Sequence, residues 1–413
     1  MDKKICVMGL GYIGLPTASL LATKGFQVHG VDVNENAVEM INSGKVHIYE
    51  PDLDILVKAA VQSGKLKASL QPEEADIFIL AVPTPFKDGH KPDLTYVEAA
   101  AKTIAPVIKN GDIVILESTS PIGTTERVAD WILAERSDLT ISEEMHSDKG
   151  RIYVAHCPER VLPGHILKEL VENDRIIGGL DKESTKRTVE FYKQFVKGQI
   201  LDTNARTAEM AKLTENSFRD VNIAFANELS LICDKLNINV WELIRLANRH
   251  PRVDILQPGP GVGGHCIAVD PWFIVDAAPE EARLIHTARN VNDYKPMYVV
   301  EKVKEKADRF KNPIISCLGL AFKANIDDLR ESPALDIVKQ LATSGVGEII
   351  AVEPHVSELP ISLKNEGVTL LPVEEAVMKS DIILVLVDHE VFLSLDFDQL
   401  KEKIVIDTKG FIN

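Results

Sequence analysis

The stretch KICVMGLGYIGLPTASLLATKG, residues 4–25, decides the fold of the N-terminal part of this chain. Its apolar run Ile5–Leu10 predicts a buried strand, and Leu15–Lys24 predicts a helix. The G-x-G-x-x-G motif Gly9–Gly14 lies between them. Glycines at these places allow a tight turn, a close approach of the backbone to a pyrophosphate, and close packing of the helix on the strand.

This glycine motif predicts a binding site for NAD. We expect the cofactor to contact five residues of the turn: Gly9, Gly11, Tyr12, Ile13 and Gly14. Asp32 ends the next predicted strand, Gln27–Asp32, where a carboxylate accepts hydrogen bonds from the ribose hydroxyls. The same charge repels a 2′-phosphate, which favours NAD over NADP. The alternative is a glycine turn that happens to stand beside a solvated aspartate.

Short apolar runs alternate with amphipathic runs throughout the first 130 residues, a pattern typical of a doubly wound parallel sheet. Further strands are predicted at Ile77–Val82, Ile113–Glu117 and Ile152–His156. Thr84 and Thr119 each follow a strand end, where ligands of open parallel sheets bind, so they are candidate NAD contacts. The alternative is that both are ordinary turn residues that cap the next helix.

The middle and the end of the chain predict a helical segment followed by a second α/β region. Thr207–Asn237, Val240–Asn248 and Ala282–Asp293 predict helices, and strands resume from Pro313–Gly319 onward. We therefore expect an α/β protein with two Rossmann-like domains joined by a long central helical segment. The expected boundaries are 1–200 for the NAD-binding domain, 201–300 for the helical connector or dimerisation domain, and 301–413 for the second α/β domain.

The composition excludes several classes of protein. A formal net charge of −16 argues against a nucleic-acid-binding protein, which needs Lys and Arg to hold phosphates. The five cysteines include no C-x-x-C pair, so we expect neither a metal site nor disulfides. No apolar stretch approaches the roughly 20 residues that span a bilayer, and no signal peptide is evident. We expect a cytoplasmic protein without membrane partners.

Cys266 is the candidate nucleophile. It follows the loop Gly259–Gly264, in which four of six residues are glycine, and such a loop can expose a thiol to a ligand. The patterns around Cys6, Cys233 and Cys317 predict buried core cysteines instead; these three are expected to be inert. On the central helix, Lys212 and Asn216 lie one turn apart, and either could stabilise an oxyanion. The alternative for Lys212 is a surface ion pair with Glu209.

The chain resembles the UDP-glucose/GDP-mannose dehydrogenase family over essentially its full length. The resemblance rests on six segments: Val7–Gly14, Val82–Pro85, Ser118–Thr125, Ala208–Asn216, Gly263–Asp270 and Gly319–Ser332. It implies a four-electron oxidation of a sugar C6 hydroxyl with two NAD, through a thiohemiacetal and then a thioester on Cys266. Within the family, the sequence GGHCIAVDPWF at 263–273 indicates UDP-N-acetyl-D-mannosamine as the substrate, with a product used in surface polysaccharide synthesis. The alternative substrate is UDP-N-acetylglucosamine or another UDP-sugar.

The resemblance also implies roles for single residues. Lys212 would be the proton donor and acceptor and the oxyanion stabiliser, with Asn216 beside it. Asp270 would orient water, Glu159 would assist hydrolysis, and Thr119 would hold a catalytic water or the nicotinamide. An NAD-binding regulator without turnover is a further alternative, but such a protein would not need this catalytic set.

The second α/β region is expected to bind the UDP-sugar. Its turn at Gly319 lacks a full G-x-G-x-x-G, so a nucleoside diphosphate fits better than a second dinucleotide. The resemblance implies that Arg330 lies where the cofactor domain faces the substrate domain and is a further contact of NAD. The resemblance implies substrate contacts by ten residues: Arg160, Val161, Lys212, Asn216, Arg219, His250, Arg252, Gly263, Phe322 and Lys323. It further implies a homodimer with Arg252 acting in trans, whereas the alternative for His250 and Arg252 is a solvated basic helix end.

Overall fold

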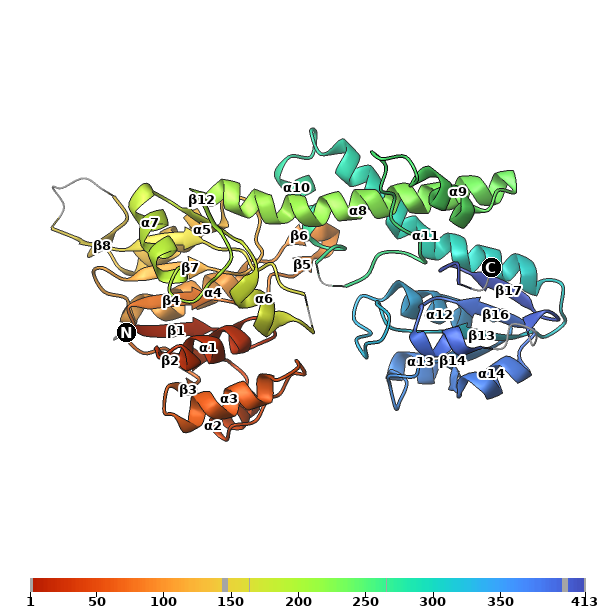
Figure 1. Ribbon diagram of the computed structural model, residues 1–413, viewed down its shortest axis with the longest axis horizontal. Helices are drawn as coiled ribbons and strands as arrows, with labels where there is room; N and C mark the ends of the chain where they lie inside the picture. The colour runs from red at the N-terminus through yellow and green to blue at the C-terminus, as the bar shows by residue number, and fades with distance from the viewer. Residues whose placement is uncertain (1–2, 143–147, 163, 265, 396–399, 412–413) are drawn as a thin grey trace. The chain divides into compact units, whose positions relative to one another are not determined.

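The computed structural model describes residues 3–142, 148–162, 164–264, 266–395 and 400–411, and Figure 1 draws its elements. The chain divides into two compact units, residues 1–215 and residues 216–413. One long helix, α8 (Ala205–Leu236), begins in the first unit and ends in the second. Among the described residues, no helix is long and apolar enough to cross a membrane.

The first unit is built on an eight-stranded sheet in the order β12-β11-β10-β7-β4-β1-β2-β3. Its strands are β1 (Lys4–Met8), β2 (Gln27–Val31), β3 (Leu66–Ser69), β4 (Ile77–Leu80), β7 (Ile113–Leu116), β10 (Tyr153–His156), β11 (Arg175–Gly179) and β12 (Ile200–Asn204). All neighbours are parallel except β10 and β11. The order reverses at β1, between β2 and β4, and this is where doubly wound sheets bind ligands.

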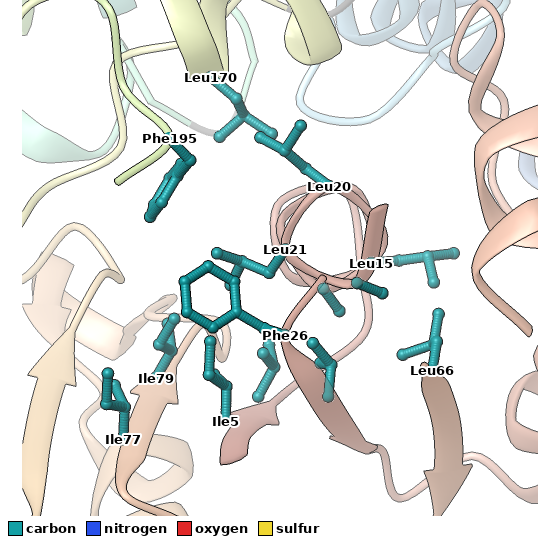
Figure 2. Packing of buried hydrophobic residues seen from close by; sticks show 14 of the residues in the cluster. Ile5, Leu15, Leu20, Leu21, Phe26, Leu66, Ile77, Ile79, Leu170 and Phe195 are labelled. Carbon is teal, nitrogen blue, oxygen red and sulfur yellow. The ribbon is translucent and has the colours of Figure 1, made fainter. Parts of the chain in front are cut away.

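Helices cover both faces of this sheet. They are α1 (Gly14–Thr23), α2 (Glu35–Asn42), α3 (Leu53–Gln62), α4 (Thr95–Ile104), α5 (Thr124–Glu135), α6 (Ile166–Glu172) and α7 (Lys182–Tyr192). One core joins the sheet to α1, α2, α3, α6 and α7, and the other joins it to α4 and α5. Figure 2 shows Leu21 and Phe26 packed over Ile5 and Ile79 in the first core. Each such side chain stabilises the fold by roughly 1.5–3 kcal/mol on burial.

The second unit combines helices with a five-stranded parallel sheet in the order β15-β14-β13-β16-β17. Its strands are β13 (Ile314–Leu318), β14 (Glu348–Val352), β15 (Thr369–Leu370), β16 (Ile382–Val385) and β17 (Ile404–Asp407). Besides the end of α8, its helices are α9 (Val240–Ala247), α10 (Asp270–Ala277), α11 (Arg283–Ala307), α12 (Pro333–Ser344), α13 (Ile361–Asn365) and α14 (Val373–Lys379). The predicted fold class, two Rossmann-like α/β parts joined by a long helical segment, is confirmed.

Short elements complete the chain. They are the paired strands β5 (Phe86–Lys87) and β6 (Lys91–Pro92), the paired strands β8 (Leu139–Thr140) and β9 (Gly150–Arg151), and the 3₁₀ helices η1 (Asp88–His90), η2 (Ala105–Val107) and η3 (Glu390–Ser394).

Helix α11 is longer than the sequence predicted. The prediction ended at Asp293, but the helix continues through Pro296 to Ala307. A proline inside a helix costs about 3 kcal/mol. The added turns bury Val299, Val303 and neighbouring residues against the C-terminal sheet, and this apolar burial outweighs the cost.

Candidate active site

The glycine turn after β1 is built as the motif predicts. Gly9 has φ +88°, and a Cβ on it would lie 2.6 Å from the carbonyl oxygen of Ala81. A Cβ on Gly14 would lie 1.8 Å from the carbonyl oxygen of Gly9, so close packing requires glycine there. A Cβ on Gly11 would meet nothing within 4 Å, so this glycine leaves open space beside the turn. The open space suits a pyrophosphate at the N-terminus of α1.

Asp32 lies directly after β2 and is tied to the glycine turn. Its Oδ2 accepts a hydrogen bond from the backbone N–H of Leu10 at 2.8 Å, and its Oδ1 accepts one from Asn34 at 2.9 Å. The side chain stays partly exposed. Each carboxylate oxygen has a second lone pair, so the half-buried Asp32 can still accept a ribose hydroxyl. The residues present fit NAD.

The structure brings Thr84 and Thr119 together at adjacent strand ends. Thr84 Oγ1 donates to the carbonyl oxygen of Thr119 at 2.5 Å, linking the loops that follow β4 and β7. Leu94 stands at the N-cap of α4 and Gly123 at the N-cap of α5, so neither threonine caps a helix. The alternative that both are capping residues is therefore wrong, while their contact with NAD stays a prediction.

Glu159 belongs to a buried cluster of ionisable groups at the ends of β7 and β10. Its Oε2 lies 2.9 Å from Arg175 Nη1, and its Oε1 accepts a hydrogen bond from the backbone N–H of Arg160 at 2.6 Å. The side chains of Glu159 and Arg175 are 7% and 1% exposed. Arg175 thus compensates the charge of a nearly buried carboxylate.

A second carboxyl group, Glu117, shares this cluster. Tyr192 donates its hydroxyl to Glu117 Oε1 at 3.2 Å. Burial, and secondarily the charge of Glu159, raises the pKa of Glu117 to about 8. Glu117 is therefore largely protonated at neutral pH while Arg175 pairs with Glu159. Sequence reasoning missed Glu117, Arg175 and Tyr192 as site residues; an acid that ends an apolar strand was the available signal.

Glu209 fixes the start of α8 to the N-terminus of α5. Its carboxylate accepts hydrogen bonds from the backbone N–H groups of Gly123 and Thr125 at 2.6 and 2.8 Å, and from Thr125 Oγ1 at 2.6 Å. The side chain is 1% exposed. The alternative of a surface ion pair between Glu209 and Lys212 is therefore wrong, and Lys212 is partly exposed one turn later on α8.

In the second unit, Asn216 and Asp270 meet beside the cysteine loop. Asn216 Nδ2 donates to Asp270 Oδ2 at 2.5 Å, and Asp270 is 3% exposed at the start of α10. The backbone N–H of Asp270 donates to the carbonyl oxygen of Cys266 at 2.8 Å. Three of the predicted catalytic residues thus stand in one constellation, whereas Lys212 belongs to the first unit.

Cys266 differs from the other cysteines by its exposure. It is the exposed one, and Cys6, Cys157, Cys233 and Cys317 are buried, as predicted for three of these four. Burial raises the pKa of Cys6, Cys157 and Cys317 to about 12, and it also raises the pKa of Cys233. A thiol with such a pKa is a poor nucleophile at neutral pH, so Cys266 is the candidate. Its neighbour His265 lies outside the described residues.

The glycines before Cys266 are explained by packing. A Cβ on Gly263 would lie 2.4 Å from the carbonyl oxygen of Glu331, and a Cβ on Gly264 would lie 3.1 Å from the ring of Phe322. Asn227 Oδ1 accepts a hydrogen bond from the backbone N–H of Gly259 at 2.9 Å and anchors the start of the loop. The loop therefore approaches the predicted UDP-binding residue Phe322 closely.

Asn227 is itself held in place by a buried polar network. Asn227 Nδ2 donates to Asn292 Oδ1 at 2.9 Å, and Asn292 donates to Asp220 Oδ1 at 2.8 Å. Arg289 Nη1 contacts the same Asp220 oxygen at 2.7 Å, with both side chains at most 2% exposed. The network joins α8 to α11. Sequence reasoning missed it because its members are 65 to 72 residues apart.

Several predicted substrate contacts, and the predicted cofactor contact Arg330, are engaged elsewhere or lie apart. Arg160 pairs with Glu215 at 2.8 Å, and Val161 packs against the first core. Arg330 contacts Asp328 through Nε and Nη2 at 2.8 and 2.6 Å. The remaining basic residues of the prediction are exposed: Arg219, His250, Arg252 and Lys323. Their roles stay predictions. In the described ranges, no group of His, Cys, Asp and Glu is arranged to hold a metal ion.

Comparisons with known proteins cover nearly all of the chain. Models of the UDP-glucose/GDP-mannose dehydrogenase family match three stretches: the NAD binding domain at residues 3–196, the central domain at 206–294, and the UDP binding domain at 316–413.

Individual relatives extend over the same length. An NDP-N-acetyl-D-galactosaminuronic acid dehydrogenase of Ralstonia nicotianae is 61% identical, covering 99% of this chain and 96% of its own. A UDP-N-acetyl-D-mannosamine dehydrogenase of Campylobacter jejuni is 59% identical over 96% and 98%. The solved UDP-N-acetyl-mannosamine dehydrogenase of Staphylococcus aureus is 43% identical, with a TM-score of 0.87 and coverage of 99% and 95%.

Proposed function

Since the chain belongs to the UDP-glucose/GDP-mannose dehydrogenase family, we propose that its substrate is UDP-N-acetyl-D-mannosamine and its product the corresponding uronate. The chain is an NAD-dependent UDP-sugar dehydrogenase. The observation that carries the proposal is the constellation around Cys266. An exposed thiol shares a turn with the buried Asp270, Asp270 is bonded to Asn216, and the loop rests on Phe322.

The proposed chemistry runs in two oxidations at one carbon. The glycine turn would hold NAD, and the bound cofactor would supply the hydride acceptor for both oxidations at C6, which remove four electrons in total. Lys212 takes the proton of the C6 hydroxyl as the aldehyde forms. The Cys266 thiolate adds to the aldehyde carbon, and the C–S bond retains the reactive intermediate between the two oxidations. Oxidation of this thiohemiacetal gives a thioester.

Hydrolysis of the thioester ends the cycle. Water adds to the thioester carbon, the C–S bond breaks, and the thiol returns with the carboxylate as product. Asp270 orients the water, and its hydrogen bond from Asn216 fixes the direction of its carboxylate. Asn216 and Lys212 stabilise the oxyanion. Glu159, which is paired with Arg175, assists the addition of water, and Thr119 holds the water or the nicotinamide.

We assign three parts to the chain in this reaction: residues 1–200 bind NAD, 201–300 carry the cysteine loop and the dimer contacts, and 301–413 bind the UDP-sugar. The dimer proposal has support from α8. Phe218, Phe225 and Ile232 repeat every seven residues on this helix and are 70%, 53% and 45% exposed. Such a stripe is typical of a helix that packs on a second copy. Arg252, exposed after α9, then acts in the partner's site.

We place the reaction in the cytoplasm, where NAD is supplied and the uronate would serve surface polysaccharide synthesis. A second candidate substrate is an N-acetylgalactosamine nucleotide, because the Ralstonia relative is named for galactosaminuronic acid. UDP-N-acetylglucosamine is a third. The choice depends on contacts to the sugar ring.

A panel of UDP-sugars tests the proposal. NADH formed per UDP-sugar is counted with the mannosamine, glucosamine and galactosamine sugars. We expect two NADH per sugar, with the mannosamine sugar preferred by kcat/KM. Preference for another sugar would correct the substrate. No NADH with any of them would refute the reaction.

The covalent step has its own test. Cys266→Ser should abolish release of the uronate, a loss of at least about 10³-fold in rate, since a serine hydroxyl is a far weaker nucleophile than a thiolate at neutral pH. Cys233→Ser, at a buried cysteine, is the matched control and should keep its turnover. Mass spectrometry of the wild-type protein during turnover should detect the sugar on Cys266. Full two-step turnover by Cys266→Ser contradicts the thioester.

A further inference from the structure

A buried carboxylate holds the near end of the loop that follows β13. Glu353 comes directly after β14, and its side chain is fully buried. Its Oε2 accepts hydrogen bonds from the backbone N–H groups of Leu320 at 2.7 Å and Ala321 at 3.0 Å, and its Oε1 accepts one from His355 at 3.2 Å. Burial alone would raise the pKa of Glu353, but these bonds and the one from His389 lower it.

A buried histidine holds the far end of the same loop. His389 is 0% exposed, and its Nε2 lies 3.1 Å from Glu353 Oε2. Its Nδ1 accepts a hydrogen bond from the backbone N–H of Asn325 at 2.9 Å. Because Nδ1 accepts, the ring proton belongs on Nε2 and is donated to Glu353. Asn325, at φ +61°, also accepts a hydrogen bond from the N–H of Glu390.

The loop held in this way presents Phe322 and Lys323. Lys323 is exposed, while Phe322 packs against Gly263 and Gly264 of the cysteine loop. The backbone N–H of Gly264 also donates to the carbonyl oxygen of Glu331 at 3.3 Å. A chain of direct contacts therefore runs from His389 through the loop to the segment that ends in Cys266.

We propose that Glu353 and His389 are positioning residues for the UDP-sugar. Their side chains fix both ends of the segment 320–325, so that Lys323 meets the diphosphate and Phe322 supports the cysteine loop without reordering on binding. A loop ordered in advance loses less conformational entropy when ligand binds, which increases affinity. This inference rests on the proposed function, because it takes Phe322 and Lys323 as substrate contacts.

A role in stability alone would look different. The core of the C-terminal sheet is apolar and is packed by the strands and α12. The hydrogen bonds of Glu353 and His389 run instead to backbone groups of loops, at Leu320, Ala321, Asn325 and His355. Removing them should therefore loosen a ligand-binding loop more than the sheet.

Three variants of His389 separate its two hydrogen bonds. His389→Phe keeps a ring and removes both bonds. His389→Asn keeps an acceptor near the place of Nδ1, for Asn325, while His389→Gln keeps a donor near the place of Nε2, for Glu353. His355→Phe is the matched control, since that exposed ring contacts His389 with 4.9 Å between the ring centroids and an angle of 44° between the ring planes.

The measurement is binding of UDP and of NAD by calorimetry, with steady-state kinetics on the UDP-sugar. We expect His389→Phe to weaken UDP binding about tenfold or more and to raise the KM for the UDP-sugar with a smaller change in kcat. NAD affinity should be unchanged. His389→Asn should recover UDP binding better than His389→Gln, because the bond to Asn325 fixes the far end of the loop.

Each other outcome has a defined meaning. If His389→Phe folds and binds UDP as tightly as the wild type, the proposal is overturned. If that variant does not fold, equal UDP affinities of His389→Asn and His389→Gln at the wild-type value overturn it instead. If the wild type itself fails to bind UDP while it binds NAD, the proposed function fails, which is a separate result.

Discussion

The two Rossmann-like sheets of this chain carry the same turn with different surroundings. Gly9 follows β1 at φ +88°, and Gly319 follows β13 at φ +93°. A Cβ would lie 2.6 Å from the Ala81 carbonyl oxygen in the first turn and 2.4 Å from Val387 Cβ in the second. In both, an acid after the neighbouring strand accepts a hydrogen bond from the residue that follows the glycine. Both turns therefore combine a glycine at positive φ after one strand with an acid after the neighbouring strand.

The two turns differ in the acid and in the distance to the next helix. Asp32 is partly exposed, and α1 begins at Gly14, five residues after Gly9. Glu353 is fully buried, and α12 begins only at Pro333, fourteen residues after Gly319. A dinucleotide needs a solvent-accessible acid for its ribose and a near helix N-terminus for its phosphates. The first turn offers both, and the second offers neither.

The largest expected effect is on stability, when the glycine of each turn is replaced by alanine. Gly9→Ala and Gly319→Ala should each destabilise their own unit by roughly 2–4 kcal/mol, because a side chain at positive φ is strained and its Cβ meets a neighbour. Differential scanning calorimetry should show a lower melting temperature for the altered unit.

Gly11→Ala is the matched control for the first turn. Its Cβ would have open space, so the melting temperature should stay close to that of the wild type. The affinity for NAD should fall about tenfold, or about 1.4 kcal/mol, because the methyl group occupies the place of the pyrophosphate. A Gly11→Ala protein that melts much earlier but binds NAD normally would contradict this division of roles.

A smaller effect concerns pH, and it has opposite sign in the two sheets. Burial is the main reason that the pKa of Glu117 is raised from 4.5 to about 8, so its stabilisation is fully present below pH 4.5 and is lost as the pH rises from there to about 8. The pKa of Glu353 is lowered, so its stabilisation is present at neutral pH and is lost as the pH falls through that lowered value.

Hydrogen exchange measured separately on peptides of each unit checks these signs. Alkaline pH should loosen the first unit around Glu117, and acid pH should loosen the second unit around Glu353. Glu117→Gln should remove much of the alkaline effect, and Glu353→Gln much of the acid effect. If both units lost protection from hydrogen exchange at the same end of the pH range, the predicted opposite signs would be wrong.

Local sequence patterns predicted much of the fold. Strands such as Ile113–Leu116 and Ile77–Leu80 are short apolar runs, and their burial follows from composition. The extension of α11 could not be predicted, since a proline normally ends a helix and only the packing of Val299 and Val303 overrides it. β11 and β12 also went unpredicted because their strands are partly polar.

The site was partly predictable for the same reason. The glycine turn, Asp32 and Cys266 are marked by motifs within a few residues. The pair of Glu159 with Arg175 depends on how β10 and β11 are placed in the sheet, and the pair of Glu353 with His389 spans 36 residues. Contacts of that kind depend on the order of the strands in the sheet. The sequence alone therefore shows only that single ionisable residues stand at strand ends, and not which of them pair.

The most direct measurement is the number of NAD and UDP molecules that each chain binds. Calorimetric titration of the wild-type protein should give one NAD and one UDP per chain. Asp32→Ala should weaken NAD binding about 10- to 100-fold, as expected for loss of hydrogen bonds to a charged group, and should leave UDP binding unchanged. A second NAD per chain, bound in competition with UDP, would contradict the claim that the two turns take different ligands.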